Sequence, residues 1–168
     1  MWESDNHVCY RHIYSGNEPS AWSSNFDEST LGKAYTVLIH KPSFLLVMSD
    51  TEVEHRSNQQ ILSEAKGDVL MFGLGINFIN DRVLALPQVR SVTIVEKYTD
   101  IIANTPTRCR VVQADVLTDD LRRLGKFDYI WNDIEPIETR DFDYLLNPTG
   151  VYRIWNQRYG LRVVAHAP

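Results

Sequence analysis

The chain has 168 residues, of which 43% are hydrophobic and 23% are charged, an ordinary composition for one globular domain. Four Trp, eight Tyr and six Phe exclude a disordered chain, and a net charge of −5 argues against a nucleic-acid partner. No apolar run is long enough to span a membrane, and the first residues lack a signal-peptide pattern. Cys9 and Cys109 belong to no zinc motif, so we expect two reduced thiols in a cytoplasmic protein.

The first predicted unit is an irregular N-terminal arm over residues 1–34, which are polar, rich in turn formers and anchored by aromatic side chains. The second unit covers residues 35–168. It begins with two apolar, β-branched runs at residues 35–39 and 44–48, separated by a proline turn, so a β-hairpin is predicted. A polar helix follows over residues 51–65 and ends at a glycine.

The rest of the chain alternates short apolar strands with helices. Strands are expected at residues 68–72, 92–95, 109–112, 127–131 and 161–165. Helices are expected at residues 78–86, 99–104, 117–124 and 147–159, the last with Asn147 as cap and Pro148 at its first position. This alternation predicts an α/β fold with a Rossmann-like doubly wound parallel sheet of about five strands, in the order 3-2-1-4-5. Its ligand site would lie beyond the carboxyl ends of the strands.

The first strand of this sheet runs into the turn Gly73-Leu74-Gly75. Glycines at a strand-to-helix turn let the backbone approach a ligand, although a tight turn without any ligand explains this pattern equally well. A dinucleotide-binding loop requires a third glycine three residues after Gly75, and Phe78 occupies that position here. The pattern therefore argues against a pyrophosphate-binding NAD loop and leaves a ligand without a pyrophosphate.

Acidic residues follow the next two strands. Glu96 lies about twenty residues beyond the glycines, where a carboxylate accepts hydrogen bonds from ribose hydroxyls; the alternative is a solvated loop carboxylate. Asp115 ends the third strand, beside Val116. It is placed to accept from the amine of a base, or else to cap the helix that follows.

A polar cluster follows the fourth strand and contains Asn132, Asp133 and Glu135. An aspartate at this edge can hold an ammonium group or act as a general base toward an amine or hydroxyl. The alternative is a polar loop capped by its own side chains. We predict a functional role, because the cluster comes directly after a strand of buried type.

Together these features resemble class I S-adenosylmethionine-dependent methyltransferases, and more narrowly their spermidine-synthase-like branch, over residues 35–168. The resemblance implies binding of S-adenosylmethionine, or its decarboxylated form, and a small-molecule acceptor. The implied cofactor-binding residues are Gly73, Leu74, Gly75, Asn77, Glu96, Lys97, Asp115, Val116 and Asp133. It also implies Asp133 and Glu135 as catalytic residues, and no metal.

The sequence departs from that family in three places. Asn77 stands where the family has its last loop glycine, and Glu135 is the nearest equivalent of the second aspartate of aminopropyltransferases. The family's antiparallel sixth and seventh strands have no counterpart here. A substrate pocket then needs residues from the arm, the hairpin or a second subunit, and the uncovered sheet edge predicts a homodimer.

Three functions remain open from the sequence. The first is transfer of a methyl or aminopropyl group to a small acceptor. The second is a catalytically degenerate protein that keeps the fold as an interaction scaffold. The third is an enzyme that cleaves S-adenosylmethionine, since fold does not determine reaction.

Overall fold

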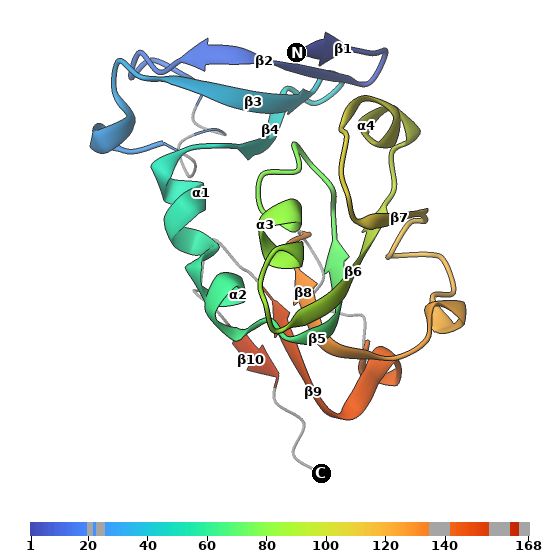
Figure 1. Cartoon of the computed structure of the whole chain (residues 1–168). Coiled ribbons are helices and arrows are strands. Elements are labelled where there is room, and N and C mark those ends of the chain that lie inside the picture. The colour runs from blue at the N-terminus through green and yellow to red at the C-terminus, as the bar shows by residue number, and fades with distance from the viewer. Residues whose placement is uncertain (20–21, 23–25, 135–141, 155–161, 165–168) are drawn as a thin grey trace.

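The computed structural model describes residues 1–19, 22, 26–134, 142–154 and 162–164, and these form two sheets (Figure 1). The first, called the N-terminal sheet below, is antiparallel, with the order β1-β2-β3-β4. Its strands are β1 (Trp2–Glu3), β2 (His7–Ile13), β3 (Ala34–His40) and β4 (Leu45–Ser49). The predicted hairpin is confirmed as β3 and β4. The prediction of an irregular arm is wrong for residues 7–13, because these residues form β2 and pair along the whole of β3.

The two faces of the N-terminal sheet have different partners, since side chains alternate along a strand. Tyr35, Val37 and Ile39 point to one face and pack on Trp22 and Phe26 from the segment between β2 and β3. The opposite face carries Cys9 and Leu38, which belong to the core of the second sheet. The N-terminal sheet therefore lies between the segment that joins β2 to β3, called the arm segment below, and the main body of the protein.

The second sheet contains the parallel strands in the order β7-β6-β5-β8-β9, which is the predicted 3-2-1-4-5 order of a Rossmann-like fold. These strands are β5 (Gly67–Phe72), β6 (Val89–Glu96), β7 (Arg110–Gln113), β8 (Phe127–Asn132) and β9 (Leu146–Ile154). In β5 the run from Val69 to Phe72 is at most 2% exposed, because both faces of a parallel sheet are covered.

The prediction for the last part of the chain is wrong. Residues 146–154 form strand β9 instead of a helix, and β10 (Arg162–Val164) pairs antiparallel to it instead of continuing the parallel order. Asn147 and Pro148 mimic a helix start, but they fall in an interruption of the β8–β9 register, where proline and glycine are tolerated. The predicted residues 155–161 lie outside the described part of the chain.

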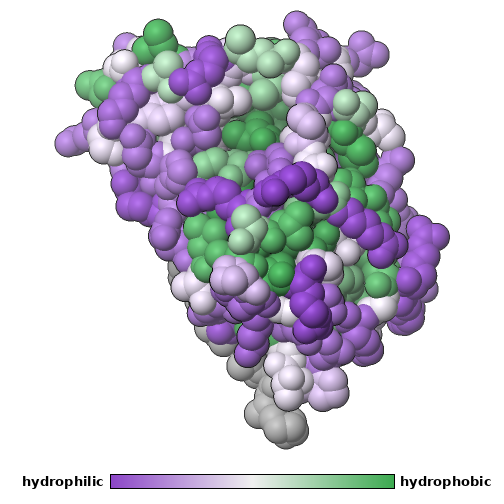
Figure 2. Space-filling model, in the orientation of Figure 1, coloured by the Kyte–Doolittle hydropathy of each residue, from purple (hydrophilic) through white to green (hydrophobic). Residues whose placement is uncertain are grey.

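The helices are short. They are α1 (Glu52–Ser57), α2 (Gln59–Glu64), α3 (Asn80–Leu84) and α4 (Thr99–Asn104), with 3₁₀ turns at Glu28–Thr30, Arg122–Leu124 and Asp143–Leu145. The predicted helix over residues 117–124 is wrong except for its final 3₁₀ turn. Figure 2 shows hydrophobic residues gathered over the face that carries α2 and α3, because such short helices leave apolar side chains half-buried. Within the described ranges, no helix has the length and apolar character needed to cross a membrane.

The N-terminal sheet lies across the edge of the parallel sheet toward which β5 and β6 point (Figure 1). Met48 of β4 lies against Gly75, just beyond the end of β5. His7 of β2 bonds to Asp100 in α4, just beyond the end of β6. The N-terminal sheet thus partly covers the carboxyl edge of the parallel sheet, where a ligand site is expected.

Candidate functional site

The turn after β5 has the backbone that its glycines allow. Gly73 and Gly75 have φ of +93° and +53°, the left-handed region that a side chain disfavours. Among the described residues, the nearest atom to a Cβ on Gly73 would be Cγ1 of Ile134 at 4.0 Å, so a Cβ there would make no overlap with them. A Cβ on Gly75 would overlap the sulfur of Met48. Gly73 is therefore favoured by its backbone conformation alone, whereas Gly75 also permits close packing of the hairpin.

Asn77, where the resemblance leads one to expect a glycine, also has a left-handed backbone conformation, with φ of +57°. Asparagine tolerates this region better than most residues. Its Nδ2 donates to the carbonyl of Pro106 at 2.8 Å, and Thr105 donates to the carbonyl of Gly75 at 3.2 Å. The glycine turn is thus tied to the segment between α4 and β7, and Asn77 preserves its shape.

Glu96 is the best-placed carboxylate of the site. It is 5% exposed, and its two oxygens accept from the main-chain N–H groups of Leu74 at 2.8 Å and Tyr98 at 2.9 Å. Its hydrogen bonds in the described structure come from main-chain N–H groups alone. Because a carboxylate has about four acceptor positions, lone pairs remain for the hydroxyls of a ribose.

Lys97 and Asp115 lie close together on the neighbouring strand ends. Lys97 Nζ is 3.0 Å from Asp115 Oδ2, and this pairing raises the pKa of the lysine. Asp115 Oδ1 accepts from the N–H of Leu117 at 2.9 Å, so Asp115 closes a local turn, although no helix begins at Leu117. Val116 is 3% exposed and packs in the apolar cluster of that face. Val116 contributes to an apolar wall beside a polar pair.

Asn132 is the last residue of β8 and Asp133 follows it, so the strand runs one residue further than predicted and both residues lie at its carboxyl end. Asn132 is completely buried; its Nδ2 donates to the hydroxyl of Tyr152 at 2.9 Å, and its Oδ1 accepts from Ile134 N–H at 3.2 Å. These bonds fix the chain at Asp133, which is partly exposed. Glu135 lies outside the described residues.

Sequence reasoning missed several residues at this edge. Tyr98 and Thr105 hold Glu96 and the glycine turn, and Met48 and His7 come from the N-terminal sheet. Asn80 is 1% exposed, and its Nδ2 donates to the carbonyl of Leu74 at 3.1 Å. Only the polar type of Asn80 at the start of α3 was a visible signal. Thr105, Met48 and His7 act through contacts distant in sequence, and Tyr98 acts through its main-chain N–H, which every residue except proline has.

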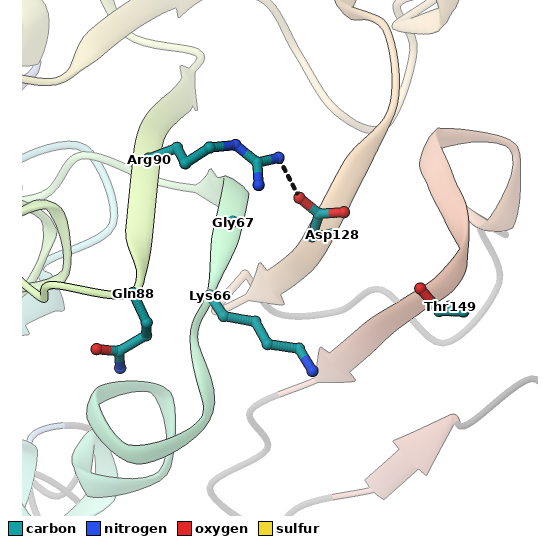
Figure 3. Close-up of a pocket in the computed structure, with 6 residues that line it drawn as sticks. All are labelled: Lys66, Gly67, Gln88, Arg90, Asp128 and Thr149. Atoms are coloured by element: carbon teal, nitrogen blue, oxygen red, sulfur yellow. Dashed lines mark hydrogen bonds and ion pairs between the residues drawn. The ribbon is translucent and has the colours of Figure 1, made fainter.

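A hollow of about 340 Å³ lies at the opposite edge of the sheet (Figure 3). Its lining residues are Lys66, Gly67, Gln88, Arg90, Asp128 and Thr149. Figure 3 shows Arg90 reaching from β6 toward Asp128 on β8, at 2.7 Å, and Arg90 also pairs with Asp68 at 2.6 Å. These charged groups bond to each other across the strand starts and stabilise the sheet.

Metal ligation finds no support in the described residues, where no group of three or more His, Cys, Asp and Glu side chains is placed to hold an ion. The predicted free thiols are confirmed, since Cys9 and Cys109 are both free and buried. Burial raises the pKa of Cys109 to about 11. His55 lies on the outside of α1, with its ring edge-on to Phe78 at 4.4 Å and its Nδ1 3.3 Å from Arg82.

No protein-family model matches the sequence, and no curated protein matches it either. Solved structures with a similar fold include a putative S-adenosylmethionine-dependent methyltransferase from Streptococcus mutans, with 19% identity, TM-score 0.44, and coverage of 73% of this chain and 39% of that one. Human methyltransferase-like protein 13, in complex with S-adenosylhomocysteine, has 19% identity, TM-score 0.39 and coverage of 57% of both chains. A putative zinc-dependent alcohol dehydrogenase from Rhodobacter sphaeroides has 18% identity, TM-score 0.44 and coverage of 59% and 44%.

The chain thus covers less than two thirds of each of these neighbours. With identities below 20% and TM-scores below 0.5, these likenesses say nothing about what this chain binds.

Proposed function

We propose that this protein binds S-adenosylmethionine and transfers its methyl group to a small-molecule acceptor. The observation that carries the proposal is the buried Glu96 carboxylate, held by two main-chain N–H groups beside a glycine turn. A nucleoside without a pyrophosphate fits this arrangement: its ribose hydroxyls need acceptors, and the turn has no third glycine for a dinucleotide.

The bound cofactor supplies an electrophilic methyl group on its sulfonium. Gly73, Leu74, Gly75 and Asn77 would shape the turn around it, and Glu96 would accept from the ribose. Lys97, Asp115 and Val116 would border the base. Asp133 would orient the acceptor amine or hydroxyl and receive its proton, with Glu135 nearby in sequence. The gain in rate would come mainly from alignment of acceptor and methyl group.

Isothermal titration with S-adenosylmethionine and S-adenosylhomocysteine tests the proposal. We expect binding by the wild-type protein and a loss of about a hundredfold in Glu96→Ala, because two charge-assisted hydrogen bonds disappear. Glu64→Ala is a control that removes a carboxylate of α2 bonded to Arg153 and Tyr129, remote from the glycine turn. Wild-type protein that binds neither compound, or unchanged binding in Glu96→Ala, contradicts the proposal.

The finer alternatives need separate measurements. Transfer of an aminopropyl group would show as a preference for decarboxylated S-adenosylmethionine in the same titration. Cleavage would release products from S-adenosylmethionine without any acceptor. A degenerate scaffold would bind the cofactor and turn over none of it with any acceptor.

We also propose that the protein is a cytoplasmic homodimer in which β4 pairs with β4 of a second copy. Phe44, Leu45 and Val47 are 76%, 52% and 46% exposed at the outer strand of the N-terminal sheet. Residues 42–49 carry no charge, and Lys41 and Asp50 flank them. Antiparallel pairing of two copies therefore brings unlike charges near each other and apolar side chains together.

Light scattering tests this pairing. The double variant Leu45→Lys, Val47→Lys should be monomeric, while Leu117→Lys, a change at another exposed apolar residue, should leave the dimer intact. A monomeric wild-type protein at micromolar concentration would contradict the dimer.

A further inference from the structure

His7 is a completely buried histidine on the face of the N-terminal sheet that meets the body. Its side chain is 0% exposed, and its Nδ1 lies 2.9 Å from Oδ2 of Asp100 in the first turn of α4. The ring packs edge-on against Tyr98, with centroids 4.6 Å apart, and lies 5.2 Å from the ring of His40. The hydroxyl of Ser4 donates to the same Asp100 oxygen. The start of α4 is therefore held by side chains of the N-terminal sheet.

The choice of histidine here is informative, because its Nε2 is buried and has no hydrogen-bond partner among the described residues. A buried polar atom without a partner is costly, so packing alone would favour an apolar residue. An apolar residue such as leucine at this position would lack the Nδ1–H group with which His7 reaches Asp100. Burial opposes the charge of Asp100, but hydrogen bonds from Ser4 and His7 outweigh it and lower the pKa of this carboxyl, so the bond from His7 is charge-assisted.

The held segment is the one that orients the cofactor acid. Tyr98 carries the ring on which His7 packs, and its main-chain N–H donates to Oε1 of Glu96. The other oxygen of Glu96 accepts from Leu74 in the glycine turn. The carboxylate thus lies between the glycine turn and a chain segment that the N-terminal sheet holds in place.

We propose that His7 is a positioning residue: through its bond to Asp100 and its contact with the ring of Tyr98, it fixes the start of α4 and so orients Glu96. The N-terminal sheet then supports the cofactor site indirectly, since we place none of its side chains against the cofactor. The consequence for cofactor affinity rests on the proposed function, while the consequence for the Tyr98 hydrogen bond does not.

The test compares His7→Leu with His7→Asn, whose side-chain amide can place an N–H where Nδ1 lies. His12→Leu is the matched control, because His12 lies on the same strand, bonds through Nε2 to Glu18 at 2.9 Å, and packs on the arm segment instead of the body. The first readout is hydrogen exchange of the Tyr98 amide by NMR. We expect about tenfold faster exchange in His7→Leu, near wild-type exchange in His7→Asn, and no change in His12→Leu.

The second readout is titration with S-adenosylmethionine, in which His7→Leu should bind about tenfold more weakly and His7→Asn within about threefold of wild type. If His7→Leu does not fold, Asp100→Asn, which removes the charge from the other side of the bond, should give the same pattern. Unchanged exchange of Tyr98, or equal acceleration in His12→Leu, overturns the positioning role. Faster exchange with unchanged cofactor affinity overturns its consequence for binding. Faster exchange in a protein whose wild type binds no cofactor supports the role of His7 and contradicts the proposed function instead.

Discussion

At both ends of β5, a glycine with positive φ lies near a carboxylate that accepts from the main chain. At the amino end, Gly67 has φ of +66°, and Asp128 accepts from the N–H of Asp68 at 2.9 Å. At the carboxyl end, Gly73 has φ of +93°, and Glu96 accepts from the N–H of Leu74 at 2.8 Å. The two arrangements look alike, yet their surroundings give them different capacities.

Asp128 also bonds to side chains. Its Oδ2 accepts from Arg90 at 2.7 Å and its Oδ1 from Asn147 at 2.7 Å, so the carboxylate links the starts of four neighbouring strands. Glu96 bonds only to N–H groups of the main chain in the described structure. The comparison shows that a partly buried carboxylate paired with an arginine stabilises the sheet, whereas a buried one held by N–H groups alone keeps acceptor capacity for a ligand.

The largest effect on stability is expected from Gly67→Ala. A Cβ at Gly67 would overlap the side chain of Asp128, and the positive φ adds strain. We expect a loss of about 3 kcal/mol in the free energy of unfolding, measured by urea denaturation. Gly32→Ala is the control, since Gly32 has φ of +73° but a Cβ there would meet no described residue within 4 Å; this variant should lose only about 1 kcal/mol. Equal losses would show that Asp128 is not packed as described.

At the other end of β5, Gly75→Ala should weaken cofactor binding by about tenfold, because its Cβ would overlap Met48 and displace the turn. The double variant Gly75→Ala, Met48→Ala should recover part of this affinity, since the obstructing side chain is gone. Titration of both variants with S-adenosylmethionine measures the coupling. Strict additivity would mean that the hairpin does not press on the glycine turn.

Acid should weaken the amino-end cluster. The N–H of Asp68, then Asn147 and Arg90, outweigh burial and hold the pKa of Asp128 below its ordinary 3.8. A lowered folded-state pKa means that the stabilisation is present above pH 3.8 and is lost as the pH falls below it. We expect the wild-type protein to lose free energy of unfolding between pH 5 and pH 3 or below, and Asp128→Asn to lose about 1 kcal/mol less over the same range. This figure allows for partial solvent screening of Asp128. An unaltered pH profile would contradict the assignment.

The smallest effect is expected from Arg90→Gln. The Arg90 side chain is 65% exposed, so its pairs with Asp68 and Asp128 are screened by water. We expect a small loss in the free energy of unfolding that shrinks in high salt, with no change in cofactor affinity. A changed affinity would show that the two ends of the sheet are coupled.

Local patterns predicted most of the body. The helix over residues 99–104 and the strands around residues 68–72 and 127–131 agree with the structure to within one or two residues, because their signals are local. Asn147 and Pro148 misled the prediction: helix-start signals act locally, whereas β9 is decided by pairing with β8. Glu96 and the glycine turn were visible in the sequence, but His7, Met48 and Tyr98 were not.

The sequence by itself determined the alternation of strands and helices, the glycines where the chain turns, and the acid at the end of the second parallel strand. These depend on residues a few positions apart, whose conformational preferences hold in any context. Only the tertiary structure decided that the N-terminal sheet covers the carboxyl edge and that residues 146–154 are a strand. It also decided that Glu96 accepts from N–H groups of the main chain, whereas Asp128 is paired with an arginine. These outcomes join residues tens of positions apart, and they follow from which surfaces bury each other when the chain folds.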